Sequence, residues 1–149
     1  MENERIITPE DAENEYGITT KYSEMPTNHE VRFRMNCSDG TAYIKTLTSK
    51  EMEGWQNAHY HKGLSETYIV GEGSIILAEV KNNKIICQEY NRGEVFTIKP
   101  NVSHNIYMRK GSTIHTVKHG KAVTSKDSVD WWCDSEECAK LNSIEIQDL

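Results

Sequence analysis

Three histidines and one glutamate have the types and the spacing that a divalent metal site needs. His59 and His61 are separated by one residue, so on a strand both side chains point to the same face and can share one ion. Residues 62–65 are few enough for a hairpin turn, which would bring the carboxylate of Glu66 back beside the histidines. His104 follows further along the chain. Such a ligand set suits Mn, Fe, Ni, Co or Zn and leaves up to two places of an octahedral sphere open.

Two stretches around these residues resemble the two sequence motifs of the cupin superfamily. Residues 54–73 are similar to the first motif, Gly-x5-His-x-His-x3,4-Glu-x6-Gly, with one residue fewer after the first glycine. Residues 93–108 are similar to the second motif, Gly-x5-Pro-x-Gly-x2-His-x3-Asn, with its first glycine and its histidine at the expected spacing. Lys99, Asn101 and Met108 stand where that motif has proline, glycine and asparagine. Asparagine is the residue best able to replace glycine at a positive φ.

The resemblance implies a fold and a set of metal ligands. Cupins are jelly-roll barrels (double-stranded β-helices), so we expect an all-β barrel over residues 30–120. We expect one domain overall, with residues 1–29 as an N-terminal extension packed on the barrel and residues 121–149 as a tail with a short helix. The resemblance also implies one divalent transition metal, held by His59, His61, Glu66 and His104. The alternative is a barrel whose histidines are satisfied by hydrogen bonds to one another and to water.

The pattern of turn residues supports an all-β core, because it divides the middle of the chain into short runs rich in β-branched residues. Helical patterns do not alternate with these runs, which favours a sandwich or barrel. The predicted strands are 31–36, 42–48, 67–70, 74–80, 85–90, 95–99, 104–108 and 113–118.

Helices are predicted only near the two ends. Thr8 is a suitable N-cap for a helical turn over residues 9–15 that stops at Gly17. Asp134 and Glu137 have the form of a capping box, which predicts a second short helix that ends near residue 142.

Two further features of the tail leave alternatives open. One indole of Trp131-Trp132 is expected to close a barrel end or fasten the tail, and the alternative is an aromatic wall for a flat ligand. The pair Cys133 and Cys138 is spaced more widely than the CxxC of zinc and redox motifs, so we do not expect a metal there.

Composition excludes several function classes. The 149 residues carry a net charge of −6, so nothing indicates a nucleic-acid partner. No apolar run approaches the roughly 20 residues that cross a bilayer, and the first residues do not have the pattern of a secretory signal. The four cysteines are scattered, so we expect reduced thiols and a cytoplasmic protein.

Other polar side chains could serve a substrate, depending on the strand register. His115 would lie near the metal if its face of the strand points inward, which makes it the first candidate for a catalytic base, and Tyr68 is the second. Arg34 and Lys45 could form a cationic lip that binds a carboxylate or phosphate. The alternative for both cations is the solvent side of a half-exposed sheet. A shift of one residue in the strand register would exchange the inward and outward faces of these side chains.

The predicted site favours three function classes. A metal with two open places could act as a Lewis acid on a small sugar- or oxo-acid-like substrate, as in an isomerase, epimerase or lyase. The chain is also similar to the single-domain cupins that accompany sugar and polysaccharide biosynthesis. The second class is a metal-dependent dioxygenase, and the third is a non-catalytic module that binds a metal and a ligand. As in many cupins, we expect a homodimer.

Overall fold

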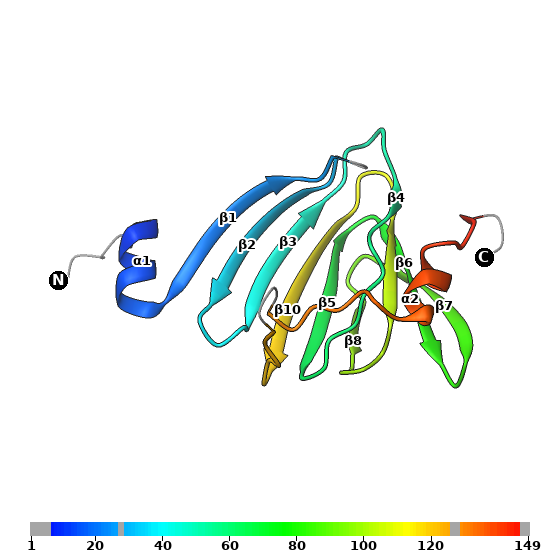
Figure 1. The fold of residues 1–149 in the computed structure, drawn as a ribbon. Coiled ribbons are helices and arrows are strands. Elements are labelled where there is room, and N and C mark those ends of the chain that lie inside the picture. Colours follow the sequence, from blue (N-terminus) through cyan, green and yellow to red (C-terminus); the bar gives the residue numbers. More distant parts are fainter. Residues whose placement is uncertain (1–6, 27–28, 126–128, 147–149) are drawn as a thin grey trace.

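The computed structural model describes residues 7–26, 29–125 and 129–146. Within them the chain forms ten strands and two helices, and all strand pairs are antiparallel (Figure 1). The elements are α1 (Pro9–Tyr16), β1 (Ile18–Glu24), β2 (Val31–Cys37), β3 (Ala42–Leu47), β4 (Gly54–Trp55), β5 (Leu64–Glu72), β6 (Ser74–Lys81), β7 (Lys84–Asn91), β8 (Val95–Ile98), β9 (His104–Met108), β10 (Thr113–Gly120) and α2 (Glu136–Leu141).

The strands form two sheets that pack face to face. The larger sheet has the order β1-β2-β3-β10-β5-β8, and the smaller has the order β4-β9-β6-β7. In Figure 1 the strands β1, β2 and β3 extend the larger sheet well beyond the smaller one, so the described sheets do not close into a complete barrel. This is the jelly-roll arrangement that the sequence predicts, and the predicted strands correspond to β2, β3 and β5–β10.

The hydrophobic core lies between the two sheets because side chains alternate across each strand. On β6 the side chains of Ile75 and Leu77 point into this core, whereas Ala78 and Val80 pack on the other side of the small sheet. The buried residues between the sheets are Tyr68, Val70, Ile75, Leu77, Phe96, Ile98, Ile106, Met108 and Ile114. Met108, which replaces the motif asparagine, is therefore a core residue.

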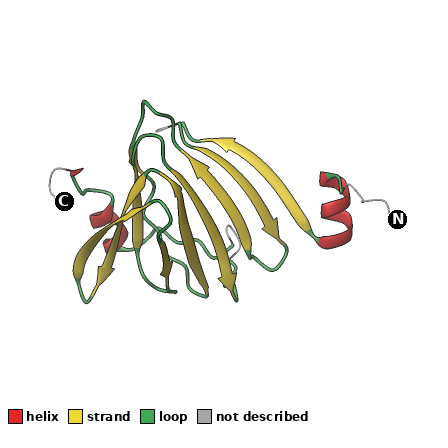
Figure 2. Ribbon diagram, turned by 180° about the vertical axis from the view of Figure 1, so that it is seen from behind, coloured by secondary structure: helices red, strands yellow, loops and turns green. Residues whose placement is uncertain are grey.

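The N-terminal helix forms as predicted, but it does not pack on the barrel. Thr8 caps α1, its side chain accepting a hydrogen bond from the backbone of Asp11, and Gly17 ends the helix at φ +66°. We expected this segment to pack on the barrel. Instead β1 pairs along β2 as an additional strand, and α1 lies beyond the outer end of β1 (Figure 1). Figure 2 shows the two helices at opposite ends of the molecule.

The C-terminal helix covers the outer face of the small sheet. Cys138 and Leu141 of α2 are fully buried against Ala78 and Val80, and the backbone N–H of Ala58 donates to the Asn142 side chain. The predicted cap at Asp134 is wrong by one residue. Ser135 is the N-cap, and the Asp134 carboxylate instead accepts a hydrogen bond from the Tyr60 hydroxyl at 3.0 Å.

Two remaining observations concern the described chain as a whole. None of its helices is long and apolar enough to span a membrane. All four cysteines are free thiols.

Candidate metal centre

The four predicted ligands meet at one point between the sheets. The Oε1 atom of Glu66 lies 2.5 Å from Nε2 of His61, 3.1 Å from Nε2 of His104 and 3.7 Å from Nε2 of His59. One potential ligand atom from each residue lies within 4.8 Å of the others. His61, Glu66 and His104 are buried, and His59 is partly open to the cavity described below.

Hydrogen bonds fix which nitrogen of each imidazole faces this point. The Nδ1 atoms of His59, His61 and His104 lie 2.8, 2.5 and 2.9 Å from the backbone carbonyls of residues 57, 130 and 102, respectively. A carbonyl can only accept, so each Nδ1 carries the proton and donates it. In the neutral imidazole the Nε2 lone pair is then directed at the Glu66 carboxylate. This orientation through Nδ1 is the usual one for metal-binding histidines.

The charge states of the cluster fit a bound cation. Burial, followed by the nearby His104, lowers the pKa of His59 to about 4, so its lone pair is available at neutral pH. Burial by itself raises the pKa of Glu66, but hydrogen bonds from the rings of His104, His59 and His61, which donate through Nε2 only when protonated, hold it well below its usual range. When the rings are neutral, a cation can take the place of those protons. Lone pairs that converge on a buried carboxylate repel one another unless a cation lies between them. The donor set therefore fits a divalent transition metal.

The local backbone explains how the four side chains converge. His59 and His104 form an isolated antiparallel bridge with two backbone hydrogen bonds of 3.1 and 2.9 Å. His104 begins β9 on the same face as Ile106, and Glu66 lies on the inward face of β5. Asn101 has a φ of +65° and donates its backbone N–H to the carbonyl of His61 at 2.6 Å. Asparagine thus takes the conformation of the motif glycine, as its place in the sequence predicts.

Tyr68 contacts the centre through Glu66. Its hydroxyl donates to Oε2 of Glu66 at 2.8 Å, and its ring stacks on Phe96. Burial and the neighbouring Glu66 raise the pKa of Tyr68 well above its ordinary value. The phenol therefore stays protonated at neutral pH. Its position suits a group that holds the carboxylate, whereas the sequence makes Tyr68 the second candidate for a catalytic base.

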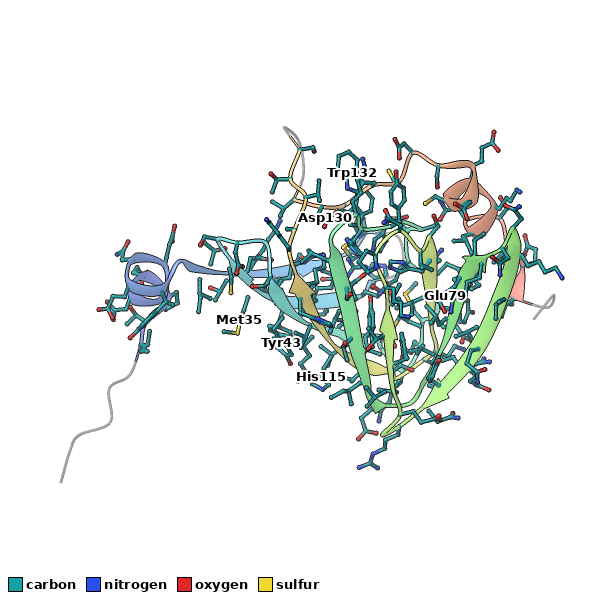
Figure 3. All side chains as sticks on the ribbon, turned by 90° about the horizontal axis from the view of Figure 1, so that it is seen from below. Met35, Tyr43, Glu79, His115, Asp130 and Trp132 are labelled. Carbon is teal, nitrogen blue, oxygen red and sulfur yellow. The ribbon has the colours of Figure 1, made fainter. Side chains whose placement is uncertain are left out.

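Strand pairing shows that His115 and Lys45 point away from the centre. Residues directly opposite each other on paired strands share a face. Glu66 is opposite Lys118, whereas His115 is opposite Ile69 on one side and Lys45 on the other. The inward placement expected for His115 is thus wrong by one residue, and its Nδ1 lies 2.7 Å from the Tyr43 hydroxyl. Figure 3 shows His115 and Tyr43 together, away from Asp130.

The inward faces of β2 and β10 supply cations. Arg34 of β2 and Lys118 of β10 line a cavity of about 520 Å³ that His59 also borders. A smaller compartment of about 60 Å³ continues inward to Glu66 and Tyr68. Of the two cations expected at the lip, Arg34 thus faces the cavity and Lys45 does not. Lys118 was not singled out from sequence, because its face depends on a register that the sequence does not give.

Trp131 and Trp132 have different roles. The ring of Trp131 lines the cavity and lies nearly parallel to that of His59, with centroids 5.2 Å apart. The indole Nε1 of Trp132 donates to Asp130 at 3.2 Å, and the ammonium of Lys62 lies 3.7 Å from the Trp132 ring centre. Trp132 therefore fastens the tail, as expected for one of the two indoles, and Trp131 is a wall of the cavity.

Asp130 is a buried acid that sequence reasoning missed. Its carboxylate accepts backbone N–H groups from Lys62, Gly63, Leu64 and Val123 at 2.6–3.2 Å, and its carbonyl accepts from His61. Although burial opposes it, this hydrogen bonding lowers the pKa of Asp130 to about 2. Asp130 has a φ of +50°, in the left-handed region that aspartate enters more readily than most residues. The sequence around it carries no metal-ligand or catalytic motif that would single it out.

Comparison with known proteins agrees with this fold. No protein-family model matches the sequence, and no curated protein matches it either. Among solved structures, oxalate decarboxylase from Bacillus subtilis at pH 4.6 aligns with a TM-score of 0.59 and 14% identity, over 74% of this chain and 29% of that chain. A structure concerned with the Mn(II) centres of the same enzyme gives a TM-score of 0.59 and 15% identity, over 74% and 30%.

These similarities establish the fold. A single-substitution variant of the same enzyme gives a TM-score of 0.58 over 77% of this chain. The chain spans about three tenths of the length of the oxalate decarboxylase chains that it matches. Together with the strand topology, they show that the chain has the cupin jelly-roll fold, and its buried cluster is consistent with a metal-binding cupin.

Proposed function

We propose that this protein is a metal-dependent lyase or isomerase that acts on a small oxo-acid- or hydroxy-acid-like substrate. The observation that carries the proposal is the convergence of three oriented imidazoles on the Glu66 carboxylate at the inner end of a cavity. That arrangement has a cost in desolvation which a purely structural core would avoid.

The chain's own groups would divide the work. His59, His61, Glu66 and His104 would hold the ion, and Tyr68 would keep the Glu66 carboxylate in place. A bound divalent metal supplies Lewis acidity, which polarises a carbonyl and favours proton loss or bond cleavage beside it. Arg34 and Lys118 present positive charge to the part of a substrate that extends outward from the metal-binding residues.

The fold comparison supports a lyase and suggests the first metal to test. Structures similar to this chain include those of an oxalate decarboxylase, and one of them concerns its Mn(II) centres. We infer that Mn(II) is a suitable ion here, with Fe, Co, Ni and Zn as alternatives that the same ligands accept. At 14–15% identity the likeness is one of fold, and the choice of a transition metal rests on the chain's own three imidazoles and carboxylate.

The test combines metal analysis with an activity screen. The purified protein is expected to contain about one transition-metal ion per chain. With that ion bound, the protein should release carbon dioxide from an oxo acid. Alternatively, in deuterated water it should exchange the C–H proton of the hydroxyl-bearing carbon next to a carbonyl. Metal-dependent oxygen uptake without either reaction would indicate the dioxygenase. Metal binding with tight retention of an unchanged ligand would indicate a binding module.

We further propose that two copies associate through the outer face of the larger sheet. Several large apolar side chains are exposed on this face, which is unusual for a surface that stays in water. They come from five of the six strands, all except β3, and are Tyr22, Phe33, Met35, Val117, Ile69 and Val95. A twofold axis would bring the same patch of each copy together.

A further inference from the structure

The cavity beside the candidate metal centre is lined by more cationic side chains than nearby carboxylates can pair with. Arg32, Arg34 and Lys118 all line it, in a chain whose net charge is −6. Arg32 is paired with the buried Glu30 at 2.9 Å. Among the residues that the structure describes, neither Arg34 nor Lys118 lies within ion-pair distance of a carboxylate.

Both cations are held in place by the sheet. Arg34 is opposite Ile44 of β3, and Ile44 is opposite Thr116, the inward neighbour of Lys118. The two side chains therefore project from nearby positions on one concave face. Burial and the other cations lower the pKa of both Arg34 and Lys118, whereas the charge of Glu66 raises it. A partly buried cation without a counter-ion is unfavourable, so the pair creates a place for an anion.

The position of these cations relative to the metal-binding residues indicates the size of the molecule that they would bind. Arg34, Lys118 and His59 border both the inner compartment of about 60 Å³ and the outer cavity of about 520 Å³. The inner compartment has room for little more than the coordinating end of a ligand. The outer volume is in the range of whole small-molecule sites, roughly 300–1,000 Å³. Oxalate would leave most of it unfilled.

We propose that Arg34 and Lys118 form a second anchoring site, which selects acids that carry an additional anionic group, a carboxylate or a phosphate monoester, beyond the metal-binding end. This inference rests on the proposed function, because it places the first end of the substrate at the metal. It adds that the substrate is at least dianionic and longer than oxalate. Trp131 lines the wall between the two ends, where it can contact a planar portion of the chain.

The test is a comparison of matched ligands on the Mn(II)-loaded protein by calorimetric titration. α-Ketoglutarate and α-ketovalerate have the same chelating end and the same number of carbons, but only the first has a distal carboxylate. Phosphohydroxypyruvate and hydroxypyruvate form the corresponding pair for a phosphate. In at least one pair, the member with the distal anion should bind about tenfold more tightly or better. The preferred pair distinguishes a carboxylate from a phosphate.

Variants connect any such preference to the two side chains. Lys118→Met and Arg34→Met should each remove most of the preference, and Lys118→Arg should retain part of it. Lys45→Met is the matched control, since Lys45 lies on the outer face of the neighbouring strand and should leave the preference unchanged. Metal content is measured on every variant, so a loss of metal is not mistaken for a loss of the anchor.

The outcomes separate the two proposals. Equal, metal-dependent binding of both members of each pair would overturn the anchoring site and leave the proposed function standing. The anchoring site is also wrong if the preference persists in both methionine variants, or if none of the four acids binds to metal-loaded protein. A purified protein that takes up no transition metal would overturn the proposed function itself. A preference for the distal anion that persists without metal supports the anchor alone.

Discussion

At the scale of single residues, the candidate centre depends on groups that orient the ligands as much as on the ligands. Each histidine donates through Nδ1 to a backbone carbonyl, and Glu66 accepts from Tyr68 on the oxygen that is turned away from the histidines. Both sets of contacts restrain the donor atoms through the protein's own groups. A preorganised donor set loses little conformational freedom on binding, which favours affinity.

Removing one imidazole should remove most of the metal. His61→Ala deletes the nitrogen nearest to Glu66 and leaves a buried carboxylate with fewer partners, so we expect at least tenfold weaker metal retention. Elemental analysis after dialysis measures it. His119→Ala is the control, because His119 is exposed on the outer face and contacts Thr67. If both variants kept equal metal, the ion would have to bind elsewhere.

Replacing Tyr68 tests the support of Glu66 separately from the ligands. Tyr68→Phe deletes the hydroxyl that donates to Oε2, so the carboxylate is less restrained, and we expect about 10- to 100-fold weaker metal binding. Competition with a chromogenic chelator measures the affinity. Tyr90→Phe is a matched control, since Tyr90 also stacks on Phe96 but lies outside the ligand cluster. Equal affinity of the two variants would show that the hydroxyl contributes nothing to the centre.

At the scale of elements, the tail that crosses the sheet edge is part of the centre. Residues Tyr60 and Trp132 form an antiparallel bridge, and Asp130 collects the backbone N–H groups of the turn between His61 and β5. The turn that separates His61 from Glu66 therefore has its conformation set by a residue far away in sequence. Figure 3 shows Asp130 and Trp132 close together at this end of the molecule.

Asp130→Asn should weaken the fold and reduce its acid dependence. The amide cannot accept all the N–H donors, so we expect a loss of about 2–3 kcal/mol in the unfolding free energy near neutral pH. The pKa of Asp130 is lowered to about 2, below the ordinary 3.8. The contribution is therefore fully present above pH 3.8 and is lost as the pH falls toward 2. Urea unfolding of metal-free protein at several pH values measures both effects.

The comparison for this prediction is Asp134→Asn. Asp134 is exposed and accepts one hydrogen bond, from Tyr60, so its replacement should cost less than about 1 kcal/mol. The stability gap between the wild type and Asp130→Asn should narrow between pH 4 and pH 2. A gap that stays constant over this range would contradict the assigned role of the carboxylate.

Sequence reasoning located what is local in this structure and missed what depends on pairing. His59, His61 and Glu66, the α1 caps and the asparagine turn follow from spacing and φ preferences within a few residues, and His104 follows from the resemblance to the second cupin motif. The face of β10 does not, because both of its faces carry polar side chains and alternation alone leaves the register open. For this reason the sequence offers His115 as a base only if its face points inward, and it does not single out Lys118. β1 and the two-residue β4 were missed, since one is largely exposed and the other is short.

At the scale of the whole molecule, the metal should stabilise both sheets. The ligands come from the segment before β5, from β5 itself and from β9, so the ion would connect the larger sheet to the smaller. A ligand at 100 times its dissociation constant adds about 2.7 kcal/mol. For a chain of this size, that corresponds to a rise of roughly 5–10 °C in Tm on adding Mn(II) to chelator-treated protein.

Thermal unfolding with and without metal measures this linkage. The His61→Ala variant should show little or no rise in Tm under the same conditions, which separates binding at the centre from weak binding at the acidic surface. An unchanged Tm in the wild type, with metal uptake confirmed, would mean that the ion does not bind at the contact between the sheets.

The outer face of the larger sheet leads to a prediction about assembly. Val117 is 47% exposed near the middle of this face, so Val117→Glu would bury charges in a twofold interface and should convert a dimer to a monomer. Light scattering after size-exclusion chromatography measures the mass. Ile86→Glu is the matched control, because Ile86 is 49% exposed but lies on β7 of the smaller sheet. Both variants should retain metal, since Val117 points away from the centre.

A wild-type protein that is monomeric at micromolar concentration would refute the dimer, and a Val117→Glu variant that remains dimeric would place the contact on another surface.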